Sequence, residues 1–268
     1  MLSFGVSIGL LSLAQGVLVA LPRASPFPAL GRLRNPWWAL VPGGSIVVVV
    51  VAIGSRPQTA EELTYLALIG VPILAALALA WVCRQANPVL GLLAVGLFVL
   101  AWRAPSTLAG EAAALGLTGL STVTLGALLA SVAPARILKA GIVVMALVDT
   151  ALVAGDLLQA PNAVLNAAAP GAGLPQLQRV VLGQAVMGYG DLFIAAALGA
   201  VLASSRPLQR RAAVLTAGLA LVFDLLFFAI PELPATVPVA AALIVVECSA
   251  VGAPIKLARV KPSKETTG

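Results

Sequence analysis

The sequence predicts an all-α, polytopic membrane protein with about nine transmembrane helices. Hydrophobic residues make up 60% of the 268 positions and charged residues only 10%. The mean hydropathy of +1.06 is far above that of a soluble domain. Only helices and closed barrels satisfy their backbone hydrogen bonds inside a bilayer. Because the apolar runs are long and lack period-two alternation, helices are the predicted spanning elements.

Nine apolar runs are separated by short polar or Pro-containing connections. In chain order they are 2–21, 37–54, 63–83, 88–103, 108–133, 137–158, 178–203, 210–230 and 234–255. The fourth run is short, and Pro72 is expected to kink the third. The connection 159–177 is too short and too rich in Pro and Gly to cross the membrane, so we expect a flexible loop there.

Basic residues indicate the orientation of the chain. The first run precedes Arg23 and has no basic segment before it, which favours a spanning helix over a cleaved signal peptide. Of the 16 Lys and Arg residues, all but Arg56, Arg103 and Arg179 fall in connections on one side of the predicted topology. This bias predicts an integral membrane protein with its N-terminus outside and its C-terminus cytoplasmic. We expect the membrane to be a prokaryotic plasma membrane.

The residue types that are absent exclude several kinds of chemistry. The chain has no His, which excludes His-dependent hydrolases and the usual zinc sites, and we expect neither a metal nor a cofactor. Cys83 and Cys248 lie at or inside apolar runs, where buried thiols are expected. The net charge of +6 comes from residues between the spans and at the C-terminus, so it does not indicate a nucleic-acid partner.

Two acids in consecutive apolar runs are the strongest functional signal. Asp149 lies near the middle of the sixth run, and Asp191 follows Gly188-Tyr189-Gly190 in the seventh. A carboxylate at the centre of a membrane helix costs about 2.5–3.5 kcal/mol. Glycines before an acid let the backbone turn or let another helix approach closely. Two adjacent carboxylates share one proton and activate a water, which is the chemistry of aspartic proteases. We therefore expect Asp149 and Asp191 to be catalytic.

Three further acids lie inside or at the ends of predicted spans. Asp156 follows Asp149 by about two turns, on nearly the same helix face, and Asp224 and Glu247 lie in the last two runs. We expect Asp156 to be an acid at the membrane interface or a modulator of the acidic pair. We expect Asp224 and Glu247 either to hydrogen-bond a partner helix or to modulate the pair. Glu111, near a helix end, is expected to pair with Arg103.

These elements resemble the intramembrane aspartyl proteases of the presenilin and signal peptide peptidase superfamily. That family has Tyr-Asp in its sixth helix, Gly-x-Gly-Asp in its seventh and Pro-Ala-Leu at the start of its ninth. The corresponding elements here are Val148-Asp149, Gly188-Tyr189-Gly190-Asp191 and Leu233-Pro234-Ala235-Thr236. Val148 stands where the family has Tyr, and Thr236 where it has Leu.

The resemblance implies a presenilin-like bundle that cleaves transmembrane or signal-peptide helices. Region 1–136 would be a five-helix scaffold, 137–258 a four-helix catalytic region and 259–268 a disordered cytoplasmic tail. Gly188, Tyr189 and Gly190 would support the catalytic acids. The Leu233-Pro234-Ala235 link would offer unpaired backbone groups to an extended substrate, since Pro cannot continue a helix. The partners would be membrane-spanning peptides and the lipid bilayer.

Three other interpretations remain open. The segment from Met187 to Gly199 is also similar to the Gly-Asp helix of prepilin peptidases, although those enzymes place a further span between their acidic helices. From another class, a proton- or cation-coupled transporter would use the intramembrane acids as a relay and the Pro/Gly breaks as discontinuous helices. A structural or assembly subunit is a third alternative.

Overall fold

A computed structural model describes residues 2–171, 173–230 and 233–251 of the chain. The predicted tail 259–268 and the last residues of the ninth predicted run lie outside this part. The main helices are α1 Phe4–Ala20, α2 Val41–Ser55, α3 Thr59–Leu77, α4 Leu93–Arg103, α5 Leu108–Val132, α6 Ala135–Ala154, α7 Gln159–Ala167, α8 Tyr189–Leu202, α9 Arg206–Phe223 and α10 Val237–Val251. Strands β1 Arg179–Leu182 and β2 Ala185–Gly188 form an antiparallel hairpin.

Shorter helical segments extend several of these helices. The π-helical turn η3 (Ala78–Val82) follows α3, and the 3₁₀ segment η5 (Asp224–Phe228) follows α9. Segments η1 (Pro28–Leu33) and η2 (Pro36–Leu40) fill the connection between α1 and α2, and η4 (Pro88–Leu92) leads into α4. Pro stands at the first or second position of η1, η2 and η4, where its missing N–H has no intrahelical acceptor to lose.

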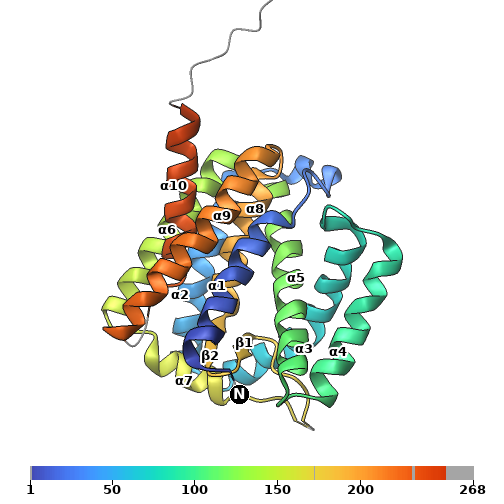
Figure 1. The fold of residues 1–268 in the computed structure, drawn as a ribbon, viewed down its shortest axis with the longest axis vertical. Coiled ribbons are helices and arrows are strands. Elements are labelled where there is room, and N and C mark those ends of the chain that lie inside the picture. The colour runs from blue at the N-terminus through green and yellow to red at the C-terminus, as the bar shows by residue number, and fades with distance from the viewer. Residues whose placement is uncertain (1, 172, 231–232, 252–268) are drawn as a thin grey trace, which may run out of the picture.

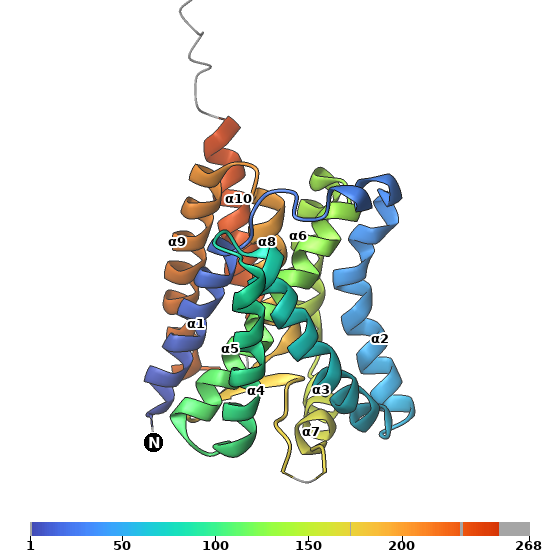
Figure 2. The ribbon, with the colours of Figure 1, turned by 90° about the vertical axis from the view of Figure 1, so that its right-hand side faces the viewer.

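Helix α8 lies at the centre of the bundle (Figure 1). It packs against α1, α5, α6, α9 and α10, and the side chains from Ile194 to Leu198 are fully buried. Helix α5 crosses α8 so closely that a Cβ on Gly126 would lie 2.8 Å from the α8 backbone. Helices α3 and α4 pack on the other side of α5, and α2 packs against α6 at the edge seen in Figure 2.

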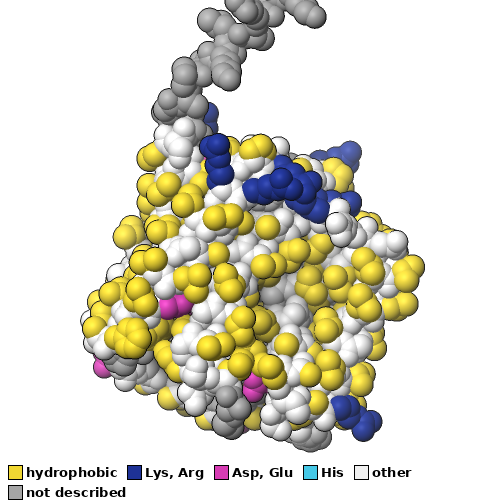
Figure 3. All heavy atoms as spheres, viewed as in Figure 1, with side chains coloured by type: hydrophobic (Ala, Val, Ile, Leu, Met, Phe, Trp, Pro, Cys, Tyr) yellow, Lys and Arg dark blue, Asp and Glu magenta, His cyan; other side chains and the backbone are white. Residues whose placement is uncertain are grey.

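The outer surface has the composition of a protein embedded in lipid. Large apolar side chains remain exposed on outer helices, such as Leu66 at 67% and Val214 at 73%. Figure 3 shows hydrophobic side chains over the sides of the bundle and basic side chains gathered mainly at one end. Five helical segments in the described part of the chain are long and apolar enough to cross a membrane. The predicted class of helical membrane protein is confirmed in this coarse form.

The predicted seventh span is wrong in its first half. The structure folds residues 179–188 into the β1–β2 hairpin, and only α8 continues as a helix. The two-residue turn begins with Gly183 at a φ of +58°, a conformation that favours glycine. The turn is held from both sides, because Gly183 N–H donates to Glu111 Oε2 (2.7 Å) and Gln184 N–H to Ser7 Oγ (3.4 Å). Glu111 therefore caps the hairpin, and the expected pair with Arg103 is not formed.

The connection 159–177 contains structure that the sequence analysis did not predict. Its first half forms α7, whose nine residues are too few to cross a bilayer. After α7, the Ala168 carbonyl accepts hydrogen bonds from the side-chain amides of Gln176 (3.0 Å) and Gln178 (3.1 Å). The chain between α6 and the hairpin is thus folded against itself instead of forming an open loop.

Candidate active site

Asp149 is a buried acid on α6, with only 5% of its surface exposed. It lies fourteen residues after the helix start at Ala135, which corresponds to about 21 Å along the axis. Its own helix turn offers no opposite charge, because the flanking residues Val148 and Thr150 are neutral. The Thr150 hydroxyl donates to the backbone carbonyl of Ala146 at 2.7 Å and so is turned back to its own helix.

Asp191 is the third residue of α8 and lies at the N-terminal end of that helix. Its Oδ2 atom accepts a hydrogen bond from the Gly188 N–H at 3.2 Å, so the side chain caps its own helix. A helix N-terminus favours a negative charge through its free N–H groups. The half-buried carboxyl group is therefore held at the point where the hairpin changes into the helix.

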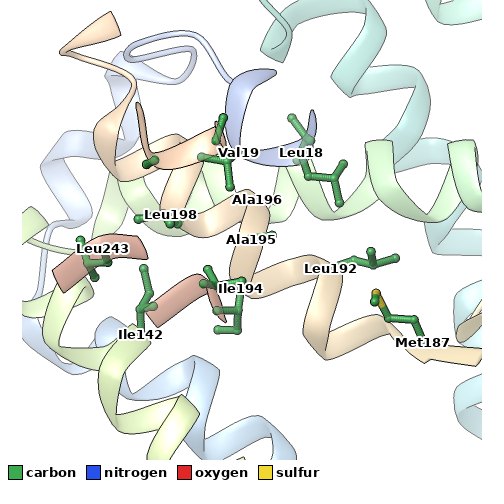
Figure 4. Packing of buried hydrophobic residues seen from close by; sticks show 14 of the residues in the cluster. Leu18, Val19, Ile142, Met187, Leu192, Ile194, Ala195, Ala196, Leu198 and Leu243 are labelled. Atoms are coloured by element: carbon green, nitrogen blue, oxygen red, sulfur yellow. The ribbon is translucent and has the colours of Figure 1, made fainter. Parts of the chain in front are cut away.

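The carboxyl groups of Asp149 and Asp191 are close enough to interact electrostatically. Helices α6 and α8 pack against each other, and the same core joins them to α10. Figure 4 shows Ile142 of α6, Ile194 of α8 and Leu243 of α10 gathered in one apolar cluster. Ile142 lies two turns before Asp149 on the same helix face, and Ile194 one turn after Asp191. The packing that joins these helices therefore brings Asp149 and Asp191 close enough for an electrostatic interaction.

The pair lies deep in the bundle. Asp191 is eleven residues from the end of α8 at Leu202, a distance of about 16 Å. The neighbouring Tyr189 hydroxyl is hydrogen-bonded to Ser121 Oγ at 2.9 Å, and Ser121 is near the middle of the 25-residue helix α5. With a hydrocarbon core about 30 Å thick, these distances place Asp191 well inside the bundle.

Thr236 is the side chain at this site that the sequence analysis did not identify. Its hydroxyl donates to Asp149 Oδ2 at 2.6 Å, and both groups are buried. A bond of this length is typical of a hydroxyl and an ionised carboxylate. In the sequence it stands out only as a departure from the Pro-Ala-Leu pattern. In the folded chain it connects the segment before α10 to the acid on α6.

A second contact fixes the register of α6 and α10. Lys139 Nζ and Glu247 Oε1 form an ion pair at 2.7 Å, with side chains 26% and 40% exposed. Lys139 precedes Asp149 by ten residues, and Glu247 follows Thr236 by eleven. The two helices therefore run antiparallel and are joined at two levels, about 15 Å apart. Glu247 fixes the frame of the site from a distance and does not belong to the acidic pair.

The glycines of the Gly-x-Gly motif do not serve for close helix packing, which corrects one expectation. A Cβ on Gly190 would meet no atom within 4 Å, and the nearest group to one on Gly188 is Asp191 Oδ2 at 3.2 Å. Both glycines are exposed. Their lack of side chains leaves open space beside Asp191. Whether this space forms a water-filled cavity between α6 and α8 remains a prediction.

The segment Leu233-Pro234-Ala235 lies next to the site, but its carbonyl groups are already used. The Ala235 carbonyl accepts from the buried Gln15 amide at 3.2 Å, and the Pro234 carbonyl from the Val237 N–H at 3.1 Å. The expectation that these groups are unpaired is wrong for the two residues. The segment instead positions Thr236, while Gln15 connects it to α1.

Two other predicted modulators lie apart from the pair. Asp156 comes after the end of α6, is exposed, and has a φ of +56°, so it is not on the helix face of Asp149 as expected. Asp224, in η5, accepts a hydrogen bond from the buried Ser12 hydroxyl of α1 at 2.7 Å. It holds α9 against α1, as part of the frame of the bundle.

Comparisons with protein-family models, with curated proteins and with solved structures gave no match for this chain. The function must therefore be argued from the site itself. Within the described residues, no three His, Cys, Asp or Glu side chains come together as metal ligands. What the site contains is a pair of carboxyl groups, each with a hydrogen-bond donor, beside open space at depth.

Proposed function

We propose that this chain is an intramembrane aspartyl protease that hydrolyses peptide bonds of membrane-spanning substrates. The observation that carries the proposal is the electrostatic interaction between Asp149 and Asp191, which come from the packed helices α6 and α8 of an apolar bundle. The resemblance to the presenilin and signal peptide peptidase superfamily supports it, since the acids occur in the same order and beside the same motif.

The chemistry follows from keeping two acids close together. Both cannot be ionised at low cost, so the pair holds one proton. The ionised carboxylate takes a proton from a bound water, whose oxygen attacks the scissile carbonyl carbon while the protonated acid donates to the carbonyl oxygen. When the tetrahedral intermediate collapses, the C–N bond breaks and the acid that took the water proton donates it to the leaving nitrogen. One hydroxyl of the intermediate returns its proton to the other carboxylate, so the pair again holds one proton. This sequence of steps needs neither a metal nor a covalent intermediate.

Space and backbone groups for a substrate are available next to Asp191. Strand β2 pairs with β1 along one edge and ends at Gly188, and its residue Val186 is 48% exposed. An unwound substrate segment has room to lie beside this strand and across the open space at Gly190. The chain would cross the membrane nine times, because four shorter apolar helices accompany the five long segments. The basic end would face the cytoplasm.

Two alternatives have less support from the described residues. A prepilin-peptidase arrangement needs another span between the acidic helices, and α7 is too short to be one. A transporter relay passes ions from one acid to the next. Asp224 instead accepts a hydrogen bond from Ser12, and Glu247 forms an ion pair with Lys139. Uptake of protons or cations into liposomes, without any proteolysis, would favour the transporter.

The test is cleavage of a reporter transmembrane peptide by the full chain in proteoliposomes. Asp149→Asn and Asp191→Asn should each abolish cleavage, because each removes one titrating member of the pair. Asp156→Asn and Asp224→Asn are matched controls and should retain most activity. Thermal unfolding of each purified variant checks that it is folded. Wild-type activity in either of the first two variants would end the assignment.

A further inference from the structure

A pocket of about 380 Å³ lies at the basic end of the bundle, far from the acidic pair. It is formed where the connection between α1 and α2 passes over the ends of α5 and α8 and the start of α6. Figure 3 shows basic side chains gathered at this end of the molecule. The polar side of the pocket is lined by Arg23, Ser25, Arg34 and Ser204, with Gly31 among the loop residues.

The two guanidinium groups in the lining have no counter-charge. Within the described part of the chain, neither Arg23 nor Arg34 forms an ion pair or a side-chain hydrogen bond, and no Asp or Glu lines the pocket. Two like charges at one pocket repel each other unless an anion lies between them. Guanidinium groups bind phosphate through charge-assisted, often paired hydrogen bonds.

Neutral donors lie beside the two arginines. The hydroxyl groups of Ser25 and Ser204 face the same pocket, and neither forms a hydrogen bond within the described residues. Ser25 is held at a φ of +48°, a conformation that costs a non-glycine residue about 1 kcal/mol or more. Ala135, the first residue of α6, also lines the pocket, so the positive end of that helix adds to the field there.

The remaining walls are apolar and come from the bundle itself. They include Phe27 of the connection, Ala130 of α5 and Val201 of α8. The volume lies at the lower end of the range for small-ligand pockets. One basic, hydroxyl-bearing wall facing an apolar one suits a phosphate group that carries a short organic or glyceryl substituent.

We propose that this pocket binds a phosphate group between Arg23 and Arg34. The group can come from the headgroup of an anionic phospholipid or from soluble phosphate, and both present the same oxygens to the arginines. The site is separate from the acidic pair and does not depend on the protease assignment. A lipid bound here would hold the α1–α2 connection against the ends of α5, α6 and α8.

The test uses the purified full chain in micelles of a maltoside detergent, which contains no phosphate. One arm adds phosphatidylglycerol to the micelles, and the other adds inorganic phosphate. Bound lipid is counted by native mass spectrometry, and the thermal unfolding midpoint is measured in both arms. Stabilisation in the first arm identifies the lipid headgroup as the ligand. Stabilisation in the second arm identifies soluble phosphate as the ligand. No binding in either arm overturns the proposal.

Single substitutions separate a built site from general surface charge. Arg23→Gln and Arg34→Gln should each weaken binding about tenfold or more, the usual effect of losing a charge-assisted hydrogen bond. Gly31→Asp should do the same, because a Cβ there meets no atom within 4 Å and its carboxylate would repel the anion. Arg32→Gln is the matched control, from the same loop but outside the lining. Equal loss in the control, or no loss in the other three, overturns the proposal.

Discussion

The hydrogen bond from Thr236 to Asp149 gives the sharpest test of the site. Thr236→Val removes the hydroxyl and keeps a side chain of nearly the same shape. The lost bond is 2.6 Å long and lies between two buried groups. Bonds to a charged group contribute about 1.5–3 kcal/mol. We therefore expect kcat for reporter cleavage to fall about 10- to 100-fold, since the carboxylate loses both a donor and its fixed orientation.

Two companion variants make this experiment specific. Thr236→Ser keeps the hydroxyl and should restore kcat to within about threefold of wild type. Thr150→Val makes the same chemical change one residue after Asp149, but that hydroxyl donates to its own helix, so activity should remain. The variants are compared by initial cleavage rates in proteoliposomes, with KM determined separately. Wild-type kcat in Thr236→Val, or an equal loss in Thr150→Val, would refute the positioning role.

Three further predictions concern the frame around the site. Gly190→Ala should lower the cleavage rate about tenfold by filling the open space beside Asp191, and it should leave the thermal unfolding midpoint unchanged. Gly126→Ala should instead lower the free energy of unfolding by about 1–3 kcal/mol, because its Cβ would lie 2.8 Å from the backbone of α8. Lys139→Gln and Glu247→Gln should each lower the free energy of unfolding by at most about 1 kcal/mol, since the ion pair is partly exposed. The double variant should lose no more stability than the worse of the two single variants. Gln209→Leu should destabilise by about 3 kcal/mol, because the two N–H groups of the buried amide are shared among the backbone carbonyls of Val19, Pro22 and Gly199. Equilibrium unfolding in mixed detergent measures these losses.

The helical segments were predictable because one physical signal dominates them. A run of apolar residues that ends at Pro, Gly or Arg must form a helix in a bilayer to satisfy its backbone hydrogen bonds. The expected helices 88–103 and 108–133 accordingly agree with Pro88–Arg103 and Leu108–Val132. The acids were predictable for the same reason, since a carboxylate in such a run requires a partner. Hydropathy does not reveal how many of these helices cross the membrane completely.

The β1–β2 hairpin was missed because hydropathy has the same value for a buried strand and a buried helix. Val180, Val181 and Val186 favour strands, and a Gly-Gln turn separates them, but the apolar run through Leu202 concealed this local signal. Thr236 was missed for a different reason. Its contact with Asp149 depends on the antiparallel register of α6 and α10, which joins residues 87 positions apart and leaves no periodic trace in the sequence.

The position of the hairpin bears directly on the open question of water at the acids. Non-helical backbone is stable at membrane depth only where protein covers it or where it lines a water-filled space. The hairpin ends at Gly188, which is exposed, and Gly190, directly before Asp191, is exposed too. This exposed backbone lies beside the half-buried Asp191, near the middle of α5. In contact with lipid, its N–H and C=O groups would lack hydrogen-bond partners, which costs free energy. Water is the solvent that removes this cost, and it is also the reactant that a pair of aspartates needs. If solvent-accessibility labelling of a cysteine placed at Gly190 found that position sealed in lipid, this connection between fold and chemistry would be broken.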